Sequence, residues 1–563
     1  MRRIAKQHNA YAGVFMPDHA KLLSKYFFLP LTIAFLIVLF YFRYMESQKV
    51  FSVDVISTQD AEALFISAPP KDDLFLELGT TLLFNGYPLP YDMEHKTYYL
   101  SQNMNTDDWQ GSLSLSTPGG ELYFLEDPLL LDKPAAISSG HTFSLCARIG
   151  GASQTLSLVI TGLPLINMTS AYSEEPVYDP DLEPDSYYFD SQTRYYGAIV
   201  IFNANPKSGK CQTVLSPVAF HERGASSTKY GRKKNYSIKL LEEDGSGNEQ
   251  YLFDIGLHAK WKLITMFNDS SKIRDITSLT LWNEIAAAAE SDFMEYSAEM
   301  TYCEVFVDGR YNGLCGVLSP VDEDTLHLKD GDSLYKLVEF GNPSPEGFQY
   351  SLENNFTIAY PVRLRYPKEP EKILAGWMPI QEYLAYAYWT PNAYAYASLL
   401  DMRNIADFYI FTQATAAADN RSKNTYMVSR RQPDGKYITY ILPWDLNYTF
   451  GEVWAQEPEK LYVEFDEDPT VIYVEPCIRQ LFDENINGAN DLLKARYLAY
   501  RADILSEDHI ISVMEENMNL LIQSGALARD TAICPDSGNS TDLTATKQFV
   551  RERMAFLDEY FLN

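Results

Sequence analysis

Residues 419–451 read DNRSKNTYMVSRRQPDGKYITYILPWDLNYTFG. The stretch begins with an acidic residue, Asp419, and an amide, Asn424, follows shortly after it. A Pro-Asp-Gly turn signal at residues 433–435 and the alternating run after it predict a hairpin. The second strand of this hairpin leads to another acidic residue, Asp445. We therefore expect the three polar side chains to meet at one point, around which the rest of the chain is organised.

Two carboxylates and an amide at this spacing suit phosphoryl transfer. One carboxylate can accept the proton of a hydroxyl group, while the other carboxylate and an amide oxygen can hold Mg²⁺, which prefers oxygen ligands. Protein kinases use the same order: Asp-x4-Asn on a loop, a short hairpin, and a metal-binding Asp after a strand. The alternative is purely structural, because Asp and Asn side chains often bond the backbone of turns and loops.

The composition indicates a folded protein of several domains. The chain has 563 residues, of which 46% are hydrophobic and 14% aromatic, which is typical of packed, ordered proteins. The net charge is -30, and most residues of the first 43 that carry charge are basic, so the remainder is strongly acidic. Such a body should repel phosphate backbones, and we therefore exclude nucleic acid as a partner.

One segment is apolar enough to cross a membrane. Residues 26–42 read YFFLPLTIAFLIVLFYF, a length at the short end of what spans a bilayer. Basic residues are more numerous before it than after it, so residues 1–25 are predicted to be a cytoplasmic tail, and residues 26–43 a single-pass transmembrane helix. A cleaved signal peptide is the alternative, but the sequence after the apolar run has no small-residue cleavage site. The body should then face away from the cytosol.

The rest of the chain predicts an α+β protein. Residues 44–162 contain short alternating runs between turn signals, such as ELYFL and HTFSLCARI, which favour an antiparallel, immunoglobulin-like β-sandwich that could bind a glycan or a protein. A second group of strands starts near residue 196, and helix-period apolar stripes dominate from about residue 373 onward. The chain is thus β-rich in its first half and helix-rich in its second half, and the segment at residues 419–451 lies at the junction.

Two basic residues occupy positions that could serve a ligand. In the strand at residues 235–240, Ile238 should face the core, so Lys239 lies on the opposite face, where it could meet phosphates or simply solvent. Arg274 falls in the first turn of a predicted helix at residues 273–289, where a cation opposes the helix dipole. This placement suggests that a carboxylate or a phosphate group lies nearby.

The six cysteines do not suggest a metal site or a dense disulfide framework. None forms a CxxC motif or a Cys/His cluster. Cys303 and Cys315 flank a hairpin turn at residues 308–309, and a two-residue loop there would place Cys303 opposite Leu314. The two thiols would then face opposite sides, so no disulfide is expected between them. A bridge between residues 477 and 534 stays open.

Five blocks, taken in order, resemble the CotH kinase family, which is named after the H protein of bacterial spore coats. They are LPLI at residues 163–166, RGASS at 223–227 followed by KKNYSIK at 233–239, NDSSKIR at 268–274, VFVDGRYNGL at 305–314, and the stretch at residues 419–451 with its PWDLN motif. The resemblance covers roughly residues 163–563.

This resemblance implies an atypical protein-kinase-like fold with a β-rich N-lobe and a helical C-lobe, preceded here by the transmembrane helix and the sandwich. The catalytic core would comprise residues 163–455, and residues 456–563 would be its helical C-terminal part. Such a kinase would use ATP with Mg²⁺ or Mn²⁺. It would phosphorylate Ser or Thr of secreted, surface or spore-coat proteins.

The resemblance also implies roles for individual residues. Asp419 would be the catalytic-loop aspartate and Asp445 the main metal ligand, with Asn424 serving beside both. The nucleotide phosphates would be faced by basic residues, and the candidates are Arg223, Lys234, Lys239 and Arg274.

The sequence departs from the family pattern at two positions. Asn447 stands where the family often has a second Asp, and Cys315 replaces a Tyr in the hairpin, a change that concerns packing. Losing a carboxylate weakens a magnesium site without abolishing it, since amide oxygens also coordinate. We therefore keep a second hypothesis, a weakly active or inactive kinase fold that serves in adhesion or in envelope or coat assembly.

Overall fold

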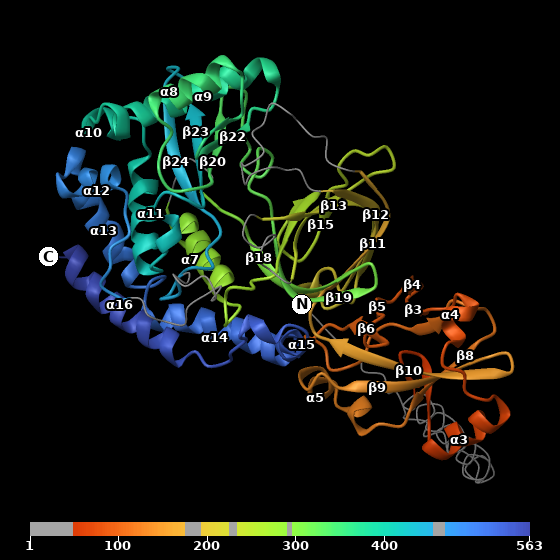
Figure 1. The fold of residues 1–563 in the computed structure, drawn as a ribbon. Coiled ribbons are helices and arrows are strands. Elements are labelled where there is room, and N and C mark those ends of the chain that lie inside the picture. The colour runs from red at the N-terminus through yellow and green to blue at the C-terminus, as the bar shows by residue number, and fades with distance from the viewer. Residues whose placement is uncertain (1–48, 175–192, 225–232, 290–294, 454–467, 563) are drawn as a thin grey trace, which may run out of the picture. The chain divides into compact units, whose positions relative to one another are not determined.

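The computed structural model describes residues 49–174, 193–224, 233–289, 295–453 and 468–562 (Figure 1). The described chain forms two compact units. The first comprises the described residues up to 86 together with residues 111–130 and 144–155, and the second comprises residues 87–110, 131–143 and 156 onward. The predicted transmembrane segment at residues 26–43 lies outside the described residues. Within the described part, no helix is both long and apolar enough to span a membrane.

The first unit mixes helices with strands. Strands β1 (Lys49–Val50), β2 (Val53–Ile56) and β8 (Glu121–Leu125) lie side by side, and β8 also pairs with β9 (Thr142–Ile149). Strand β3 (Leu82–Phe84) pairs with β7 (Leu113–Leu115). Helices α3 (Thr58–Ser67) and α4 (Leu74–Leu78) belong to the same unit. The β2–β8 pair is parallel, which a purely antiparallel sandwich does not contain.

This arrangement corrects the expected all-β, immunoglobulin-like sandwich. The apolar run LFLEL, within the region expected to contain only strands, forms helix α4, which ends at Gly79 with φ of 59°. A left-handed glycine is the usual stop of a helix, and a five-residue apolar run does not by itself distinguish a helix from a strand. The two units also do not divide at residue 162, where the sequence suggested a boundary.

The second unit begins with short elements around a parallel strand pair. Strand β6 (Thr97–Ser101) runs parallel to the end of β10 (Ala152–Thr161) and antiparallel to β5 (Tyr91–Asp92). Helix α5 (Lys133–Ser138) carries the buried Lys133, whose ammonium group donates to the carbonyl oxygens of Asn103, Thr106 and Asp108.

A closed barrel of seven strands follows. In order around the barrel its strands are β11 (Leu165–Glu174), β12 (Arg194–Phe202), β13 (Thr213–Arg223), β14 (Asn235–Leu240), β17 (Lys260–Ile264), β19 (Arg310–Leu318) and β18 (Met300–Val307). Alternate residues such as Ile238, Trp261 and Val305 fill the interior. A parallel pairing of β11 with β18 closes the barrel.

The β18–β19 hairpin has the predicted turn but a shifted register. Val307 lies opposite Arg310 across the turn at residues 308–309, yet the pairing skips Asn312 further along. This bulge places Cys303 opposite Cys315 rather than opposite Leu314, and both cysteines lie in the barrel core. The predicted pairing was therefore wrong by one residue. All six cysteines are free thiols in this structure, including Cys477 and Cys534.

A five-stranded sheet and a group of helices complete the second unit (Figure 1). In order across the sheet its strands are β21 (Ile358–Ala359), β22 (Val362–Tyr366), β20 (Ser333–Leu337), β23 (Thr425–Arg431) and β24 (Tyr437–Pro443). The helices are α7 (Arg274–Ala288), α8 (Pro345–Glu353), α9 (Ile373–Leu384), α10 (Ala393–Ala397), α11 (Met402–Ala414), α12 (Pro476–Asp483), α13 (Ala489–Arg501), α14 (Glu507–Gln523), α15 (Ala526–Ile533) and α16 (Thr544–Leu562).

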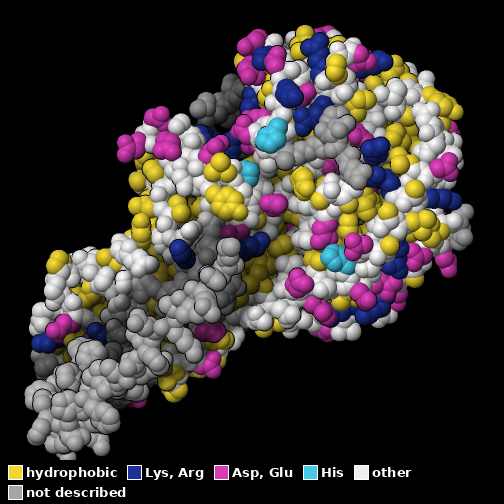
Figure 2. Space-filling view, turned by 180° about the vertical axis from the view of Figure 1, so that it is seen from behind, with side chains coloured by type: hydrophobic (Ala, Val, Ile, Leu, Met, Phe, Trp, Pro, Cys, Tyr) yellow, Lys and Arg dark blue, Asp and Glu magenta, His cyan; other side chains and the backbone are white. Residues whose placement is uncertain are grey.

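Helix α11 is the centre of this part of the molecule. All its residues from Asn404 to Ala414 are buried, and it packs against β24, α7, α13 and α16. A helix that is covered on every side holds whatever follows it in a fixed place, and α11 leads directly to Asp419. The α+β class and the hairpin at residues 419–451 are thus confirmed. On the outer surface, acidic and basic side chains are interspersed with apolar ones (Figure 2).

Candidate functional site

The two polar loops of the predicted site lie at the same end of the β23–β24 hairpin. Thr425 is the Cα partner of Pro443, so the residues just outside these positions, Asn424 and Trp444, are neighbours. The Trp444 amide donates to the Asn424 carbonyl oxygen at 2.9 Å. Hairpin register therefore brings Asn424 next to Asp445, as the spacing predicted.

A buried amide that the sequence analysis did not single out joins the two loops. The Nδ2 group of Asn420 donates to the carbonyl oxygens of Asn424, at 2.8 Å, and of Trp444, at 2.7 Å. Asn420 is fully buried. Its position next to Asp419 was the only sequence signal available for it.

Asp419 is buried and keeps one oxygen without a partner. It lies in a short 3-10 helix, Ala418–Arg421, just after α11. Its Oδ2 accepts a hydrogen bond from Nδ2 of Asn424 at 2.7 Å, and the Lys423 ammonium group lies 3.7 Å from the same oxygen. Its Oδ1 is buried and accepts no hydrogen bond from any described residue. Buried acceptors are normally satisfied, so this oxygen is available to a donor that enters the site.

The environment of Asp419 raises its pKa. Burial is the largest cause, the nearby carboxylates of Asp445 and Glu339 act in the same direction, and Lys423 opposes them, which brings the pKa to about 6. A carboxylate with this pKa is still mostly ionised near neutral pH, and it is a stronger base than an ordinary aspartate.

Asp445 is exposed, and its carboxylate has no polar partner among the described residues. It follows directly after Trp444 with a left-handed backbone, φ of 60°. Its carboxylate forms no hydrogen bond or ion pair with any residue that the structure describes. Asn447 is partly exposed two positions further on. An open carboxylate beside amide oxygens is a suitable donor set for Mg²⁺.

The protein donors alone do not make a complete metal cage. Among the described residues, no group of three or more His, Cys, Asp or Glu side chains has the arrangement of a metal site. Mg²⁺ usually takes only one or two carboxylates from the protein and completes its shell with water and substrate phosphates. The residues present therefore fit a metal that arrives with a phosphorylated ligand.

Arg274 is not at the open site. Its Nη1 lies 2.7 Å from Oδ1 of Asp269 and 2.7 Å from Oε2 of Glu452, and its Nε donates to the Thr449 carbonyl oxygen at 3.0 Å. The side chain is fully buried. The predicted partner of this helix-start cation is thus a pair of carboxylates, and Arg274 braces the loop that follows Asp445 from behind.

The same helix holds this loop at a second point. Asp275, the next residue of α7, accepts the Leu446 amide at 2.8 Å. Burial raises the pKa of Asp275, and the neighbouring Asp445 carboxylate raises it further. The first turn of α7 therefore fixes the backbone that follows the exposed Asp445 side chain, at Leu446 and at Thr449.

One of the two predicted barrel lysines, Lys239, lies on the outside of the barrel. Ile238 faces the interior, so Lys239 projects outward, and its Cα partner across the ladder is another cation, Lys260. The ammonium group of Lys234 lies 3.8 Å from Glu222. Of the predicted cations, Arg223 is the one whose charge affects the pKa of Lys336, a residue whose pKa Asp445 also affects.

Lys336 is the basic residue that the sequence analysis missed. It lies on β20, and its ammonium group is 5.5 Å from the Trp444 ring centroid and 5.6 Å from that of Tyr426. Burial and the charge of Arg223 lower the pKa of Lys336 to about 7, Arg365 and Arg363 act in the same direction, and Asp445 opposes them. The sequence around β20 has no clear helix or strand pattern. Pairing of β20 with β23 is what brings Lys336 to the site.

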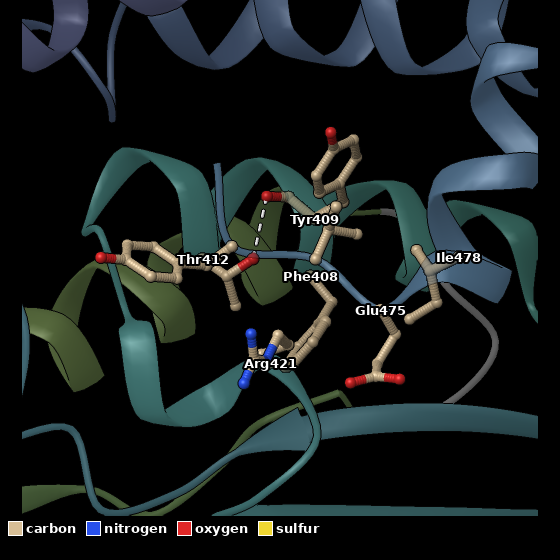
Figure 3. A pocket seen from close by; sticks show the side chains of 8 residues that line it. Phe408, Tyr409, Thr412, Arg421, Glu475 and Ile478 are labelled. Carbon is tan, nitrogen blue, oxygen red and sulfur yellow. Dashed lines mark hydrogen bonds between the residues drawn. The ribbon is translucent and has the colours of Figure 1, made fainter. Parts of the chain in front are cut away.

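A small cavity lies between helix α11 and residues 473–478 (Figure 3). Its volume is about 10 Å³, and its lining residues are Phe408, Tyr409, Thr412, Arg421, Tyr473, Val474, Glu475 and Ile478. Figure 3 shows the side chains of Arg421 and Glu475 on the same side of the helix that carries Tyr409. The cavity is smaller than the pockets that usually hold a nucleotide, about 300–1,000 Å³, so it is not the site of a nucleotide.

Comparison with known families supports the resemblance noted in the sequence. A family model described as CotH kinase protein matches residues 220–557. No curated protein matches the chain. The matched range starts within β13, ends within α16, and includes both polar loops and the whole five-stranded sheet.

Proposed function

Because the chain belongs to the CotH kinase protein family, we propose that it is an atypical protein kinase that transfers the γ-phosphate of ATP to a Ser or Thr hydroxyl. The observation that carries this proposal is the pairing of a buried carboxylate oxygen without a partner, on Asp419, with an open carboxylate, on Asp445, at one end of one hairpin. The first is suited to a proton and the second to a cation.

Asp419 is the proposed base. Its Oδ1 accepts the proton of the acceptor hydroxyl while the hydroxyl oxygen attacks the γ-phosphorus, and ADP leaves with the bridging oxygen. The hydrogen bond from Asn424 to Oδ2 orients the carboxylate, so that Oδ1 faces the incoming group. The raised pKa strengthens this base without removing its charge at neutral pH.

Asp445, Asn424 and Asn447 are the proposed ligands of Mg²⁺ or Mn²⁺. The Nδ2 group of Asn424 is used by Asp419, which leaves its amide oxygen as the group able to coordinate. A bound divalent cation supplies charge neutralisation for the phosphoryl oxygens in the transition state. The α7 contacts to Leu446 and Thr449 keep the Asp445 loop in place for this purpose.

The membrane and the acceptor belong to the same proposal. We infer from residues 26–43 that the chain is a single-pass membrane protein with a cytoplasmic N-terminus. Its acceptor would be a secreted, surface or spore-coat protein, and the first unit is free for a glycan or protein ligand. The absence of a second carboxylate at Asn447 keeps the alternative open, a kinase fold with little or no activity that acts in adhesion or in coat assembly.

The test is transfer of labelled phosphate from ATP by the full chain in detergent with Mg²⁺ or Mn²⁺. We expect label on the protein or on added acceptor proteins, and a loss of about 100-fold or more in Asp419→Asn and Asp445→Asn. Asp434→Asn is the matched control, since Asp434 is an exposed aspartate on the turn of the same hairpin, and it should keep full activity.

Two outcomes separate the function from the assignment of residues. If the wild-type chain transfers no label and ATP with Mg²⁺ does not raise its Tm, the kinase proposal is wrong. If label appears and Asp445→Asn retains it, the activity is real and the metal site lies elsewhere.

A further inference from the structure

One face of the five-stranded sheet carries a group of cations. Lys336 on β20 has Arg363 on β22 as its direct Cα partner. Arg365 lies two positions further along β22, where the pairing with β20 skips one residue, and its charge acts on Lys336, while Val362 and Leu364 are buried. Like charges directly opposite each other on neighbouring strands destabilise a sheet, so this arrangement needs a compensating reason.

Among the described residues, the positive charge of Lys336 is only partly compensated. Asp445 is the one carboxylate among the main charges that act on Lys336, whereas Arg223, Arg365 and Arg363 all act against its positive charge. Neither Lys336 nor Arg365 forms an ion pair or a hydrogen bond with a residue in the described ranges. Both side chains are partly exposed, so an anion from solution can reach them.

The surroundings of Lys336 restrict its ammonium group to this position. The rings of Trp444 and Tyr426 lie at similar distances from it and attract a cation through their faces. Because Trp444 directly precedes Asp445, the ring and the carboxylate move together. A chain of phosphoryl groups requires positive charge on both sides. A cation beside a metal-binding carboxylate provides this, because the metal lies on one side and the fixed positive charge on the other.

We propose that Lys336 and Arg365, on the face of the five-stranded sheet next to Asp445, bind the phosphate chain of the nucleotide. Arg363 and Arg223 add positive charge on the same side. That the ligand is a nucleotide rests on the proposed function. The residues themselves form a binding site for condensed phosphate together with a divalent cation. The phosphates thus lie on the sheet and not on the outward-facing lysines of the barrel.

Binding of magnesium tripolyphosphate to the full chain, measured by isothermal titration calorimetry, tests the site without any requirement for catalysis. We expect Lys336→Met and Arg365→Met each to raise the Kd at least about tenfold, which is the loss of one charged contact. Lys336→Arg should stay within about threefold of wild type, because it keeps the charge. Lys239→Met is the matched control on the barrel and should leave the Kd unchanged.

The stability of the free protein gives a second readout. Since Lys336 is opposed by like charges, Lys336→Met should leave the Tm of the ligand-free protein unchanged or raise it, whereas loss of a merely structural residue would lower it. Tripolyphosphate with Mg²⁺ should raise the Tm of wild type and fail to raise that of the variant.

The outcomes distinguish the two proposals. The phosphate site is wrong if wild type does not bind tripolyphosphate. It is also wrong if Lys336→Met binds tripolyphosphate with the Kd of wild type. If wild type binds tripolyphosphate through Lys336 but never transfers phosphate from ATP, the site stands and the kinase function fails.

Discussion

At the scale of single residues, the two loops of the site depend on unusual backbone conformations. Asn424 and Asp445 have φ of 52° and 60°, in the left-handed region that most side chains avoid and that Asn and Asp tolerate best. Asn424 comes just before β23 and Asp445 shortly after β24, so each makes a sharp turn at the same end of the hairpin and also presents a polar side chain. An Asp-to-Asn exchange keeps the first property and changes the second, which makes it the appropriate substitution here.

The raised pKa of Asp419 predicts how activity depends on pH. Asp419 must be ionised to accept a proton, and its pKa is about 6, so the rate should fall about tenfold for each pH unit below 6 and level off above it. The measurement is the single-turnover rate of transfer at saturating ATP and Mg²⁺ between pH 4.5 and 7.5. This range extends roughly 1.5 pH units below and above the pKa of Asp419. A rate that is constant from pH 5 to 7 would show that Asp419 is not the base.

Substitution of Asn447 by Asp should raise the affinity of the site for Mg²⁺. Replacing it with Asp adds a carboxylate two residues from Asp445, and Mg²⁺ sites bind more tightly as the charge of the ligands rises. Asn447→Asp should lower the Mg²⁺ concentration for half-maximal transfer by about threefold or more. Asn487→Asp, at a position outside the site, is the control. An unchanged Mg²⁺ requirement would place the metal out of reach of residue 447.

At the scale of elements, the site is a meeting of α11, α7 and the β23–β24 hairpin. Helix α11 delivers Asp419, the hairpin register aligns Asn424 with Trp444, and α7 holds the loop after Asp445 through Asp275 and Arg274. The side chains that perform the proposed chemistry are thus few, and they are held by a larger set of buried polar contacts.

Loss of the Arg274 contacts should destabilise this whole region. Arg274→Met leaves Asp269 and Glu452 buried without their cation, and breaking a buried ion pair in this way costs about 3 kcal/mol or more. The measurement is the free energy of unfolding of the second unit in urea, followed by tryptophan fluorescence. Arg479→Met, which breaks only the exposed pair with Asp483, should cost less than about 1 kcal/mol. Equal effects of the two substitutions would contradict the bracing role.

At the scale of the whole molecule, the net charge bears on the kinds of partner that the protein can bind. A net charge of -30 disfavours binding to nucleic acid and to anionic surfaces. Within this acidic chain, the cations near Asp445 form a local exception, and electrostatic focusing of this kind would favour entry of an anionic nucleotide at that one place.

The N-terminal segment predicts a fractionation result. The full chain should remain in the membrane fraction after a carbonate wash, and a chain that lacks residues 1–43 should move to the soluble fraction, because one apolar segment of this length holds a protein in a bilayer. A chain that lacks only residues 1–25 is the control and should stay with the membrane. Recovery of the full chain in the soluble fraction would exclude the anchor.

The sequence by itself determined the features that depend on neighbours along the chain. The turn at residues 433–435, the strands beside it and the position of Asp445 follow from local alternation and turn chemistry, and the ordered motifs identified the family that the match at residues 220–557 confirms. The helix with Arg274 in its first turn, and a carboxylate partner for that cation, were also predictable, because an uncompensated cation at a helix start is unfavourable.

Only the tertiary structure decided the features that depend on residues distant in sequence. A one-residue bulge at Asn312 set Cys303 opposite Cys315, and local patterns carry no signal for such a bulge. Lys336 reached the site because β20 pairs with β23, about ninety residues away, by a register set through long-range burial. The stretch at residues 419–451 was therefore sufficient to predict a site. The residues that surround this stretch depend on packing between strands and helices that are distant in sequence, and local patterns do not predict such packing.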